Sequence, residues 1–362
     1  MKKHLHNSLR TLFLSMAVLL SLPMLGEKVE IGGINYELNT KVKRASVIAK
    51  SSGKYSGDVV ISESVEHEGT VYSVTSIGDS AFYKCSGLIS ITIPNTVNKI
   101  GYEAFSFCSG LSTVHIFDIA AWCNIDFVAY YSHPFNWADH LYMNGVEVKD
   151  LVIPNSVTSI RDYAFLDCKA LTSVTIPSSV KSIGKNAFSG CKGLTSVSIP
   201  NSVKSIGGLA FSRCYGLTSV TIGNSVKSIG HSAFYNCSGL ISITIGNSVT
   251  SIGEWAFRDC SELLDVYCHA EKVPSTESDA FEGSYPENAT LHVPDASIDS
   301  YKAKTPWSSF GKIVALTPEE TGIDELKGEN GTENSAVYDL SGRRVQKAQK
   351  GILIQNGKVV VK

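Results

Sequence analysis

The chain has 362 residues and a formal net charge of −2, and 18% of its residues are charged. This balance excludes the strongly basic surface typical of a nucleic-acid-binding protein. A hydrophobic content of 43% excludes an intrinsically disordered chain. A chain of this length would ordinarily form two or three globular domains, unless it is built from repeats.

Residues 1–26 have the features of a secretory signal peptide. Three basic residues precede or border an apolar run over residues 12–22. The run is shorter than the roughly 20 residues that span a bilayer, but it fits the apolar core of a signal peptide. We expect export with cleavage near Gly26. We also expect no membrane span, because no second apolar segment is long enough.

Residues 27–75 are rich in strand and turn signals and precede the regular part of the chain. An open end of a repeat array exposes apolar surface and unpaired strand edges. We therefore predict that these residues form an N-terminal β-rich cap.

Residues 76–294 repeat with a 23-residue period. In most copies an Ala-Phe pair is followed by a cysteine three residues after the phenylalanine. The phenylalanines in this pattern are Phe82, Phe105, Phe165, Phe188, Phe211, Phe234 and Phe257. A repeat this regular predicts a solenoid, in which consecutive coils stack and bury one another's apolar faces.

Each 23-residue coil is expected to hold a short strand and a helical turn. In residues 171–176, apolar side chains alternate with Ser173 and Thr175, which is typical of a strand. Pro177 ends the strand because proline cannot donate a ladder hydrogen bond. The spacing of the later apolar positions, over 183–191, favours a helical turn that faces inward.

The recurring strings Ser-Ile-Gly-x-x-Ala-Phe-x-x-Cys-x-x-Leu and Val-Thr-Ile-Pro resemble the BspA type of leucine-rich repeat over roughly residues 59 to 293. The resemblance implies an α/β repeat solenoid of the leucine-rich-repeat class. It also implies an adhesin-like secreted or cell-surface protein that binds host or bacterial macromolecules. The chain departs from the pattern at Arg161, which replaces a glycine, and at Gly223 and Gly246, which replace the strand-ending proline.

One coil is longer than the others. The spacing from Ile116 to Ile153 is 37 residues, so 14 additional residues lie near 117–149. We expect a short helix and a loop that bulge from one edge of the solenoid. The insert is the most aromatic part of the chain and includes Trp122 and Trp137. Two interpretations remain open: these residues add packing, or they anchor a partner, since tryptophan and tyrosine are favoured at binding hot spots.

Residues 295–316 are expected to form a C-terminal cap, with an amphipathic helix over 296–310 that closes the core. The segment 317–335 is rich in Glu, Gly, Thr and Asn, which indicates a linker.

Residues 336–362 predict a small β tail, in which Asn356-Gly357 between two apolar runs marks a hairpin. The strings Tyr-Asp-Leu-x-Gly-Arg and Gly-Ile-x-Ile resemble the C-terminal sorting domain of the type IX secretion system. This resemblance implies export to the outer-membrane surface of a Gram-negative bacterium. An ordinary small β module that is kept after export is the alternative.

The cysteines of the repeat are expected to be small buried thiols. Residues in register on neighbouring coils lie about 4.7–4.9 Å apart and point the same way, which does not suit a disulfide. Cys123 and Cys268 lie outside this column. Neither has the doubled, close ligand spacing of a metal site. The other residues considered as ligands are His133, Asp139, His140 and His269.

The sequence contains no nucleophile elbow, phosphate-cradling glycine loop or His-Glu-x-x-His motif. The carboxylates Asp118, Asp126 and Asp139 are separate in the sequence. We therefore expect no cofactor and predict that the protein is not an enzyme.

The outward strand positions are the candidate binding surface, which we expect on the concave side of the solenoid. They are Ser173, Thr175, Ser196, Ser198, Ser219, Thr221, Ser242 and Thr244, with His115, Tyr267, Trp122 and Trp137 as bulkier candidates. Such a strip would bind extracellular protein or glycan ligands, on matrix proteins or other cells, by many weak polar contacts. We expect the protein to act as a monomer. The alternatives are a merely solvated sheet and a structural envelope protein without a specific ligand.

Overall fold

The computed structural model describes residues 26–317 and Glu320, together with the backbone of four short strands between Val337 and Val361. The predicted signal peptide, apart from Gly26, and nearly all of the predicted linker lie outside the described residues. The chain forms two compact units, 1–321 and 322–362.

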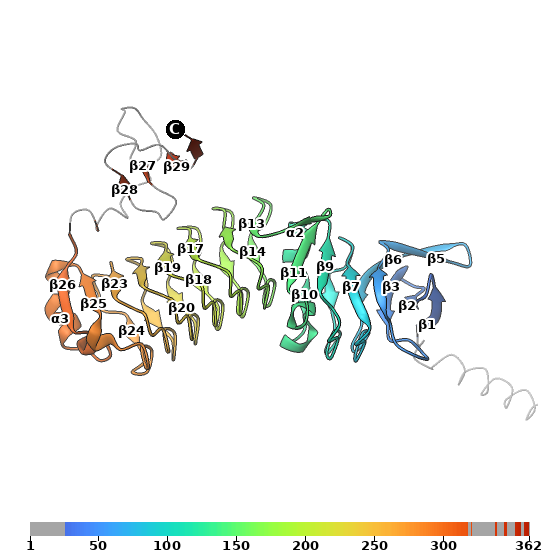
Figure 1. Ribbon diagram of the computed structural model, residues 1–362, viewed down its shortest axis with the longest axis horizontal. Helices are drawn as coiled ribbons and strands as arrows, with labels where there is room; N and C mark the ends of the chain where they lie inside the picture. Colours follow the sequence, from blue (N-terminus) through green and yellow to red (C-terminus); the bar gives the residue numbers. More distant parts are fainter. Residues whose placement is uncertain are drawn as a thin grey trace, which may run out of the picture. The chain divides into compact units, whose positions relative to one another are not determined.

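The first unit is a repeat solenoid built mainly from parallel strands, with few helices (Figure 1). Each regular coil adds one strand to a first face and a two-residue strand to a second face. The first-face strands are β4 (Gly57–Val60), β7 (Leu88–Thr92), β9 (Thr113–Ile116), β11 (His140–Met143), β13 (Asp150–Val152), β15 (Ser173–Thr175), β17 (Ser196–Ile199), β19 (Ser219–Ile222), β21 (Ser242–Ile245), β23 (Asp265–Cys268), β25 (Thr290–Val293) and β26 (Lys312–Ala315). The two-residue second-face strands are β8 (Lys99–Ile100), β10 (Asp126–Phe127), β14 (Ser159–Ile160), β16 (Ser182–Ile183), β18 (Ser205–Ile206), β20 (Ser228–Ile229), β22 (Ser251–Ile252) and β24 (Ser275–Thr276).

Strands of neighbouring coils pair in parallel and in register. On the first face, Ser196 lies opposite Ser219, which lies opposite Ser242. On the second face, Ser182 lies opposite Ser205. Equivalent residues of consecutive coils therefore stack directly on one another, as the repeat predicts.

The segment between the second-face strand and the next first-face strand is a run of turns, and not the helical turn that we expected. Over residues 186–191, every second N–H donates to a carbonyl three residues earlier, as Ser189 does to Asn186 at 3.2 Å. The N–H groups between them donate to the next coil, as Phe188 does to Ala210 at 2.7 Å. Asn186 has a φ of 55°, a left-handed conformation that interrupts a right-handed helix. The turns thus leave alternate amides free to tie one coil to the next.

The phenylalanines of the repeat form an internal column, as predicted. From Phe165 to Phe281, consecutive rings stack with centroids 5.2 to 5.5 Å apart and interplanar angles of 4° to 16°. Phe82 and Phe105 stack in the same way at 5.0 Å. All of these rings are buried. The column is therefore the centre of the apolar core.

The insert differs from the single bulge that we expected. Strand β11 pairs with β9 so that His140 lies opposite Thr113, whereas a regular 23-residue coil would place Asn136 there. This coil is therefore only four residues longer than a regular one. It contains α2 (Ile119–Cys123) and the short 3-10 helices η1 (Tyr130–Ser132) and η2 (Pro134–Asn136).

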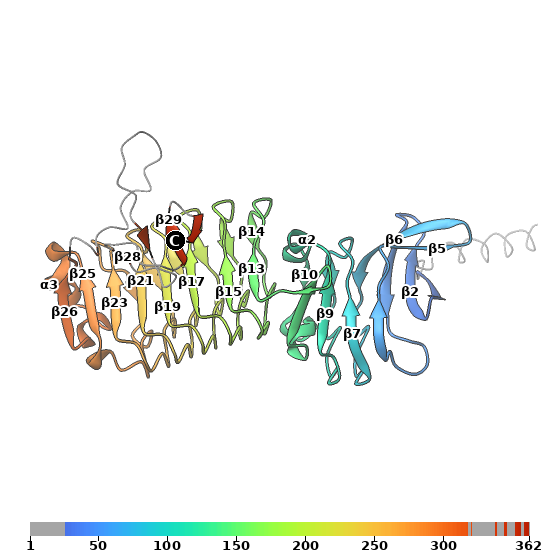
Figure 2. The same ribbon diagram turned by 45° about the horizontal axis from the view of Figure 1, so that its top comes forward.

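The remaining additional residues form an incomplete coil. After β11 the chain turns at Asn144-Gly145 into β12 (Val146–Glu147), which pairs antiparallel with β11. Both turn residues have positive φ, 51° and 80°, as a two-residue hairpin turn of the mirror-image type I requires. The chain then enters β13 without forming a second-face strand (Figure 2). The strand ladders are interrupted here, between an N-terminal block (26–147) and a C-terminal block (150–317).

Side chains of the insert connect the two blocks. Trp122 Nε1 donates to the carbonyl of Ala164 at 2.7 Å, and the Tyr130 hydroxyl donates to Asp167 at 3.0 Å. Lys169 pairs with Asp139 at 2.5 Å. These contacts replace the ladder hydrogen bonds that the incomplete coil does not make.

Distinct elements close the ends of the first unit. At the N-terminus, β1 (Glu27–Ile31), β2 (Ile34–Asn39) and β3 (Arg44–Ile48) form an antiparallel meander. Strand β6 (Thr70–Ile77) continues this sheet parallel to β3 and pairs antiparallel with β5 (Ser64–His67).

At the C-terminus, the helix expected over 296–310 is divided into η4 (Asp295–Ser297), α3 (Ile298–Lys302) and η5 (Trp307–Ser309). Pro306, which does not fit a helix interior, lies between α3 and η5. Trp307 and Phe310 pack edge-on against Phe281 and end the phenylalanine column. Strand β26, after this segment, is the last strand of the first face.

The second unit contains a four-stranded antiparallel sheet of β27 (Val337–Tyr338), β28 (Arg344–Val345), β29 (Ile352–Gln355) and β30 (Lys358–Val361). Gln355 lies opposite Lys358 in the β29–β30 pair, and the predicted turn residues Asn356-Gly357 lie outside the described residues.

Candidate functional site

The outward side chains of the first face form a strip of hydroxyl groups across the C-terminal block. Thr175, Ser196, Ser198 and Thr221 are exposed, and the other predicted members, Ser173, Ser219, Ser242 and Thr244, are half-buried. The strip follows from the period of two in each strand, because Val and Ile of the same strands fill the core. We refer to these eight residues as the hydroxyl strip.

A column of threonines borders the hydroxyl strip. Thr195 and Thr218 each donate a side-chain hydrogen bond to the carbonyl of the equivalent residue one coil earlier, at 3.3 and 3.1 Å. At the edge of the block, Ser173 donates to Asp150 at 2.6 Å. The bordering hydroxyls are thus engaged within the protein, whereas those of Ser196, Ser198 and Thr221 point away from the core and are exposed.

A stacked histidine–tyrosine pair lies on the first face of each block. His115 stacks on Tyr142 with ring centroids 5.0 Å apart, and Tyr267 stacks on His292 at 4.3 Å. His115 and Tyr267 were predicted as surface candidates, but their partners were missed. Tyr142 and His292 lie directly opposite them in the ladder. In each pair the two residues are more than 23 positions apart in the sequence, so the regular repeat does not align them.

The pair in the C-terminal block carries charge as well as aromatic surface. His292 Nε2 lies 3.1 Å from an Asp265 carboxylate oxygen, and Nδ1 lies 3.5 Å from Glu320. Burial, followed by the nearby carboxylates of Asp265 and Glu320, raises the pKa of Tyr267 above its usual range. The Tyr267 hydroxyl therefore stays protonated and can act as a hydrogen-bond donor at neutral pH.

Trp122 does not belong to the candidate surface, and its prediction as a surface residue is wrong. Its side chain is 1% exposed and packs against Phe127, His133 and Phe135. Trp137 is half-buried and lies 6.4 Å from the exposed ring of Phe107. For Trp122 the packing interpretation is the correct one, because its indole fills the space between the two blocks.

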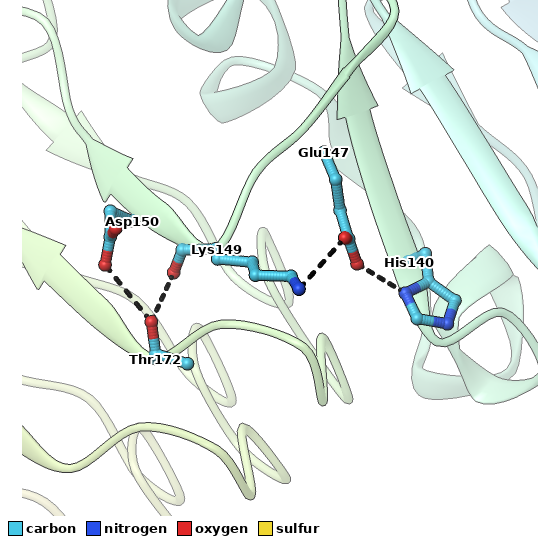
Figure 3. A network of polar contacts seen from close by, with 5 residues as sticks. All are labelled: His140, Glu147, Lys149, Asp150 and Thr172. Carbon is cyan, nitrogen blue, oxygen red and sulfur yellow. Dashed lines mark hydrogen bonds and ion pairs between the residues drawn. The ribbon is translucent and has the colours of Figure 1, made fainter.

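A polar network marks the first face where the ladder is interrupted (Figure 3). His140 and Lys149 both contact the Glu147 carboxylate, at 2.6 and 3.3 Å. The hydrogen bond from His140, followed by the contacts with Lys149, lowers the pKa of Glu147. On the other side of the link, Thr172 Oγ1 lies 3.2 Å from the Lys149 carbonyl and 3.1 Å from Asp150. The network fixes the short connection between β12 and β13.

The chain matches a family model described as the BspA type leucine rich repeat region, in six copies over residues 63–127, 137–263 and 182–302. The matched residues make up more than half of the chain. The chain belongs to the BspA-type leucine-rich repeat family. No curated protein matches the chain.

Solved structures of bacterial leucine-rich repeat proteins are similar to this BspA-type chain. A leucine rich cell surface protein from Faecalibacterium prausnitzii is 23% identical, covers 84% of this chain and 99% of its own, and has a TM-score of 0.33. The leucine rich repeat protein of T. pallidum is 25% identical, with coverages of 66% and 91% and a TM-score of 0.37. The pneumococcal vaccine antigen PcpA is 17% identical, with coverages of 81% and 99% and a TM-score of 0.47.

The cysteines of the BspA-type coils are buried free thiols, as predicted. Cys191 Sγ donates to the carbonyl of Phe165, one coil earlier, at 3.2 Å. Cys214 and Cys237 repeat this bond at 3.2 and 3.1 Å. Outside the column, Cys123 is buried at the end of α2, and the Cys268 thiol lies 3.2 Å from the Tyr301 hydroxyl.

The residues considered as metal ligands are not brought together. Asp139 pairs with Lys169, His140 contacts Glu147, and His133 lies in the aromatic cluster of the insert. Within residues 26–317, no group of three histidine, cysteine or acidic side chains could hold a metal ion.

The separate carboxylates of the insert do not form a pair. Asp118 caps the N-terminus of α2 by accepting from Ala121 N at 2.6 Å, Asp139 pairs with Lys169, and Asp126 is exposed on β10. The BspA-type fold is that of a repeat protein rather than of a known enzyme class. In the described part of the chain, no helix has the length and apolar character needed to cross a membrane.

Proposed function

We propose that the protein is an exported, adhesin-like binding protein that recognises extracellular proteins or glycans through its first face. The observation that carries the proposal is the hydroxyl strip, in which β15 to β21 present outward Ser and Thr side chains, next to the Tyr267–His292 pair on β23 and β25. Hydroxyl groups both donate and accept hydrogen bonds, and the stacked rings add apolar contact area.

The shape of this surface favours an extended ligand. The strands are in register, so contact groups recur from coil to coil at the strand spacing of about 4.8 Å. Each exposed hydroxyl contributes little binding energy alone, and affinity then depends on many contacts along the array. A protein segment or a glycan chain of an extracellular matrix or another cell has this form.

We propose the following organisation for export. Residues 1–26 direct secretion, 27–75 and 295–316 cap the repeats of 76–294, and 317–335 link them to a sorting module at 336–362. This arrangement leads to the outer-membrane surface of a Gram-negative bacterium or to secretion, with the protein acting as a monomer. Membership of the BspA-type family supports a surface or secreted location.

The proposal is tested by binding of the mature chain, 27–362, to a panel of immobilised matrix proteins and glycans. We expect saturable binding to at least one member. A Ser198→Arg/Thr244→Arg variant places two bulky charges on the hydroxyl strip and should weaken that binding at least about tenfold. A Thr158→Arg/Thr250→Arg variant adds the same charge beside the second-face strands β14 and β22 and should bind as the wild type does.

The alternative function is a structural envelope protein without a specific ligand. It predicts no saturable binding across the panel, or binding that both double variants reduce equally. Either result would remove the hydroxyl strip as a recognition surface.

A further inference from the structure

The incomplete coil leaves one position of the second face without a strand. Strands β7, β9, β13 and β15 are each followed by a two-residue second-face strand, namely β8, β10, β14 and β16. Strand β11 is followed by the hairpin strand β12 instead. The second-face ladder of the N-terminal block therefore ends at β10, and that of the C-terminal block begins at β14.

A groove of about 310 Å³ lies at this position and is lined by residues of β10, β14 and β16. Its exposed lining is Asp126, Arg161 and Asp162. Its lining also includes Ile125, Phe127 and Ile160, whose side chains are buried in the core. A small volume whose exposed lining is polar suits the backbone of a short extended peptide.

The backbone of β10 offers hydrogen-bonding groups to this groove. Asp126 N donates to Asn98 at 2.9 Å and Val128 N donates to Ile100 at 3.1 Å, so both residues direct their amides toward β8. Because successive residues of a strand direct their amides to opposite sides, the N–H and C=O of Phe127 face the groove.

The backbone of β14 does the same from the other side. Lys181 N and Gly184 N donate to the carbonyls of Thr158 and Ile160, both at 2.8 Å, so those two residues face β16. By the same alternation, the N–H and C=O of Ser159 face the groove. The edges of β10 and β14 thus face the same vacant strand position. A polypeptide backbone placed there can form hydrogen bonds with the free N–H and C=O groups of both edges.

Arg161 lines the groove at the end of β14. The coils that follow have glycine at the equivalent position, at 184, 207, 230 and 253. A Cβ at Gly184 would lie 2.5 Å from Asp162 N, and one at Gly207 would lie 2.6 Å from the Gly184 backbone. The preceding coil lies against these glycines. No second-face strand of this chain lies before Arg161.

We propose that this groove binds an extended segment of another protein, which adds as a short strand parallel to β10 and β14. The inserted dipeptide resembles the strands beside it, with a small polar residue followed by an aliphatic residue. The Arg161 side chain forces the segment to leave the groove after these two residues. The site lies on the second face and does not depend on recognition by the hydroxyl strip.

The test uses a fluorescent peptide with the sequence of residues 178–186, Ser-Ser-Val-Lys-Ser-Ile-Gly-Lys-Asn, titrated with the mature protein. We expect saturable binding, and at least a roughly tenfold loss when the isoleucine of the peptide is replaced by aspartate. Ser159→Pro removes the N–H that faces the groove, at an edge position where proline is tolerated. It should weaken binding at least about tenfold, whereas Ser159→Ala keeps the N–H and should bind within about twofold of wild type.

Amide hydrogen exchange gives a readout that does not depend on a variant. In the wild-type protein, the peptide should slow exchange at Phe127 and Ser159. Absence of peptide binding to the wild type would overturn the proposal, as would equal binding by the proline and alanine variants. Self-association of the wild type that Ser159→Pro abolishes would also overturn it, because a second copy would then be the occupant.

Discussion

The carbonyl of Phe165 accepts two hydrogen bonds, one from Cys168 N in its own coil at 3.3 Å and one from the Cys191 thiol in the next coil at 3.2 Å. Burial raises the pKa of the equivalent Cys214 to about 12, so the thiol remains a donor at neutral pH. The last coil has Ser284 in place of cysteine, and its hydroxyl donates to Phe257 at 2.5 Å. The column thus requires a small buried donor, and a thiol or a hydroxyl can provide it.

The burial of these cysteines could be predicted from the repeat, whereas their hydrogen bonds could not. The period aligns Cys191 with Cys214, which have the same place in consecutive coils. The bond instead joins Cys191 to Phe165, a different position of the preceding coil, and this pairing depends on how far the turns offset one coil from the next.

Replacing Phe211 by alanine should lower the free energy of unfolding by about 3–5 kcal/mol. The ring is fully buried and stacks on Phe188 and Phe234 at 5.2 and 5.3 Å, so its loss leaves a cavity inside the column. Chemical denaturation measures the change. Tyr215→Ala, at an exposed aromatic residue of the same coil, is the control and should cost less than about 1 kcal/mol. An equally small effect at Phe211 would contradict the structure.

At the scale of the element, the insert is the part that sequence reasoning resolved least. The distance in sequence between Ile116 and Ile153 gave the number of added residues correctly. It did not show that some of them lengthen one coil and the rest form an incomplete coil. Asn144-Gly145, between Met143 and Val146, was the available signal for the hairpin. The same dipeptide signal at 356–357 lies outside the described residues. A count of residues between repeats shows an insertion, and only the local turn chemistry shows its shape.

The insert should make the protein sensitive to acid through His133. This side chain is fully buried against Trp122, Phe127 and Phe135. Burial lowers its pKa to about 3, partly offset by the Ala164 backbone. The unfolded chain binds a proton below its ordinary pKa of about 6.5 while the folded chain does not, so stability falls as pH decreases from that value toward the folded pKa.

The expected loss from this histidine is about 2 kcal/mol between roughly pH 7 and pH 5. Thermal unfolding across this range measures it, with His133→Leu as the comparison. The variant should lose less stability on acidification than the wild type, whatever its stability at neutral pH. Parallel pH profiles for the two proteins would show that His133 is not the group responsible.

At the scale of the whole molecule, the repeat solenoid could be predicted because its period relates residues that are far apart in the chain. The phenylalanine column and the outward hydroxyls follow directly from that period. The division into two blocks could not be predicted, because it arises where the hairpin strand β12 follows β11 in place of a second-face strand. The Tyr142 and His292 partners were missed for a related reason: their offsets from His115 and Tyr267 depart from the period.

Deleting residues 336–362 should leave the solenoid folded and abolish surface display. The two units are compact by themselves, so removal of the second should not change the thermal unfolding of the first. Cell fractionation and antibody labelling of intact cells measure display, with a deletion confined to 322–335 as the control. Normal display of the 336–362 deletion would refute the sorting assignment.

In the turns of each coil, every second backbone N–H donates a hydrogen bond to a neighbouring coil. This shared pattern makes the middle coils of the C-terminal block interchangeable. The turns that begin at Gly184, Gly207 and Gly230 make the same bonds to their neighbours, so the loss or duplication of a whole coil among them joins surfaces that already match. The coil of Arg161 differs from them, because it has an arginine where these coils have a glycine that packs on the coil before. The array can therefore change length in whole 23-residue steps at its centre while its starting point stays in place, and the reach of its first face can be adjusted without redesigning either end.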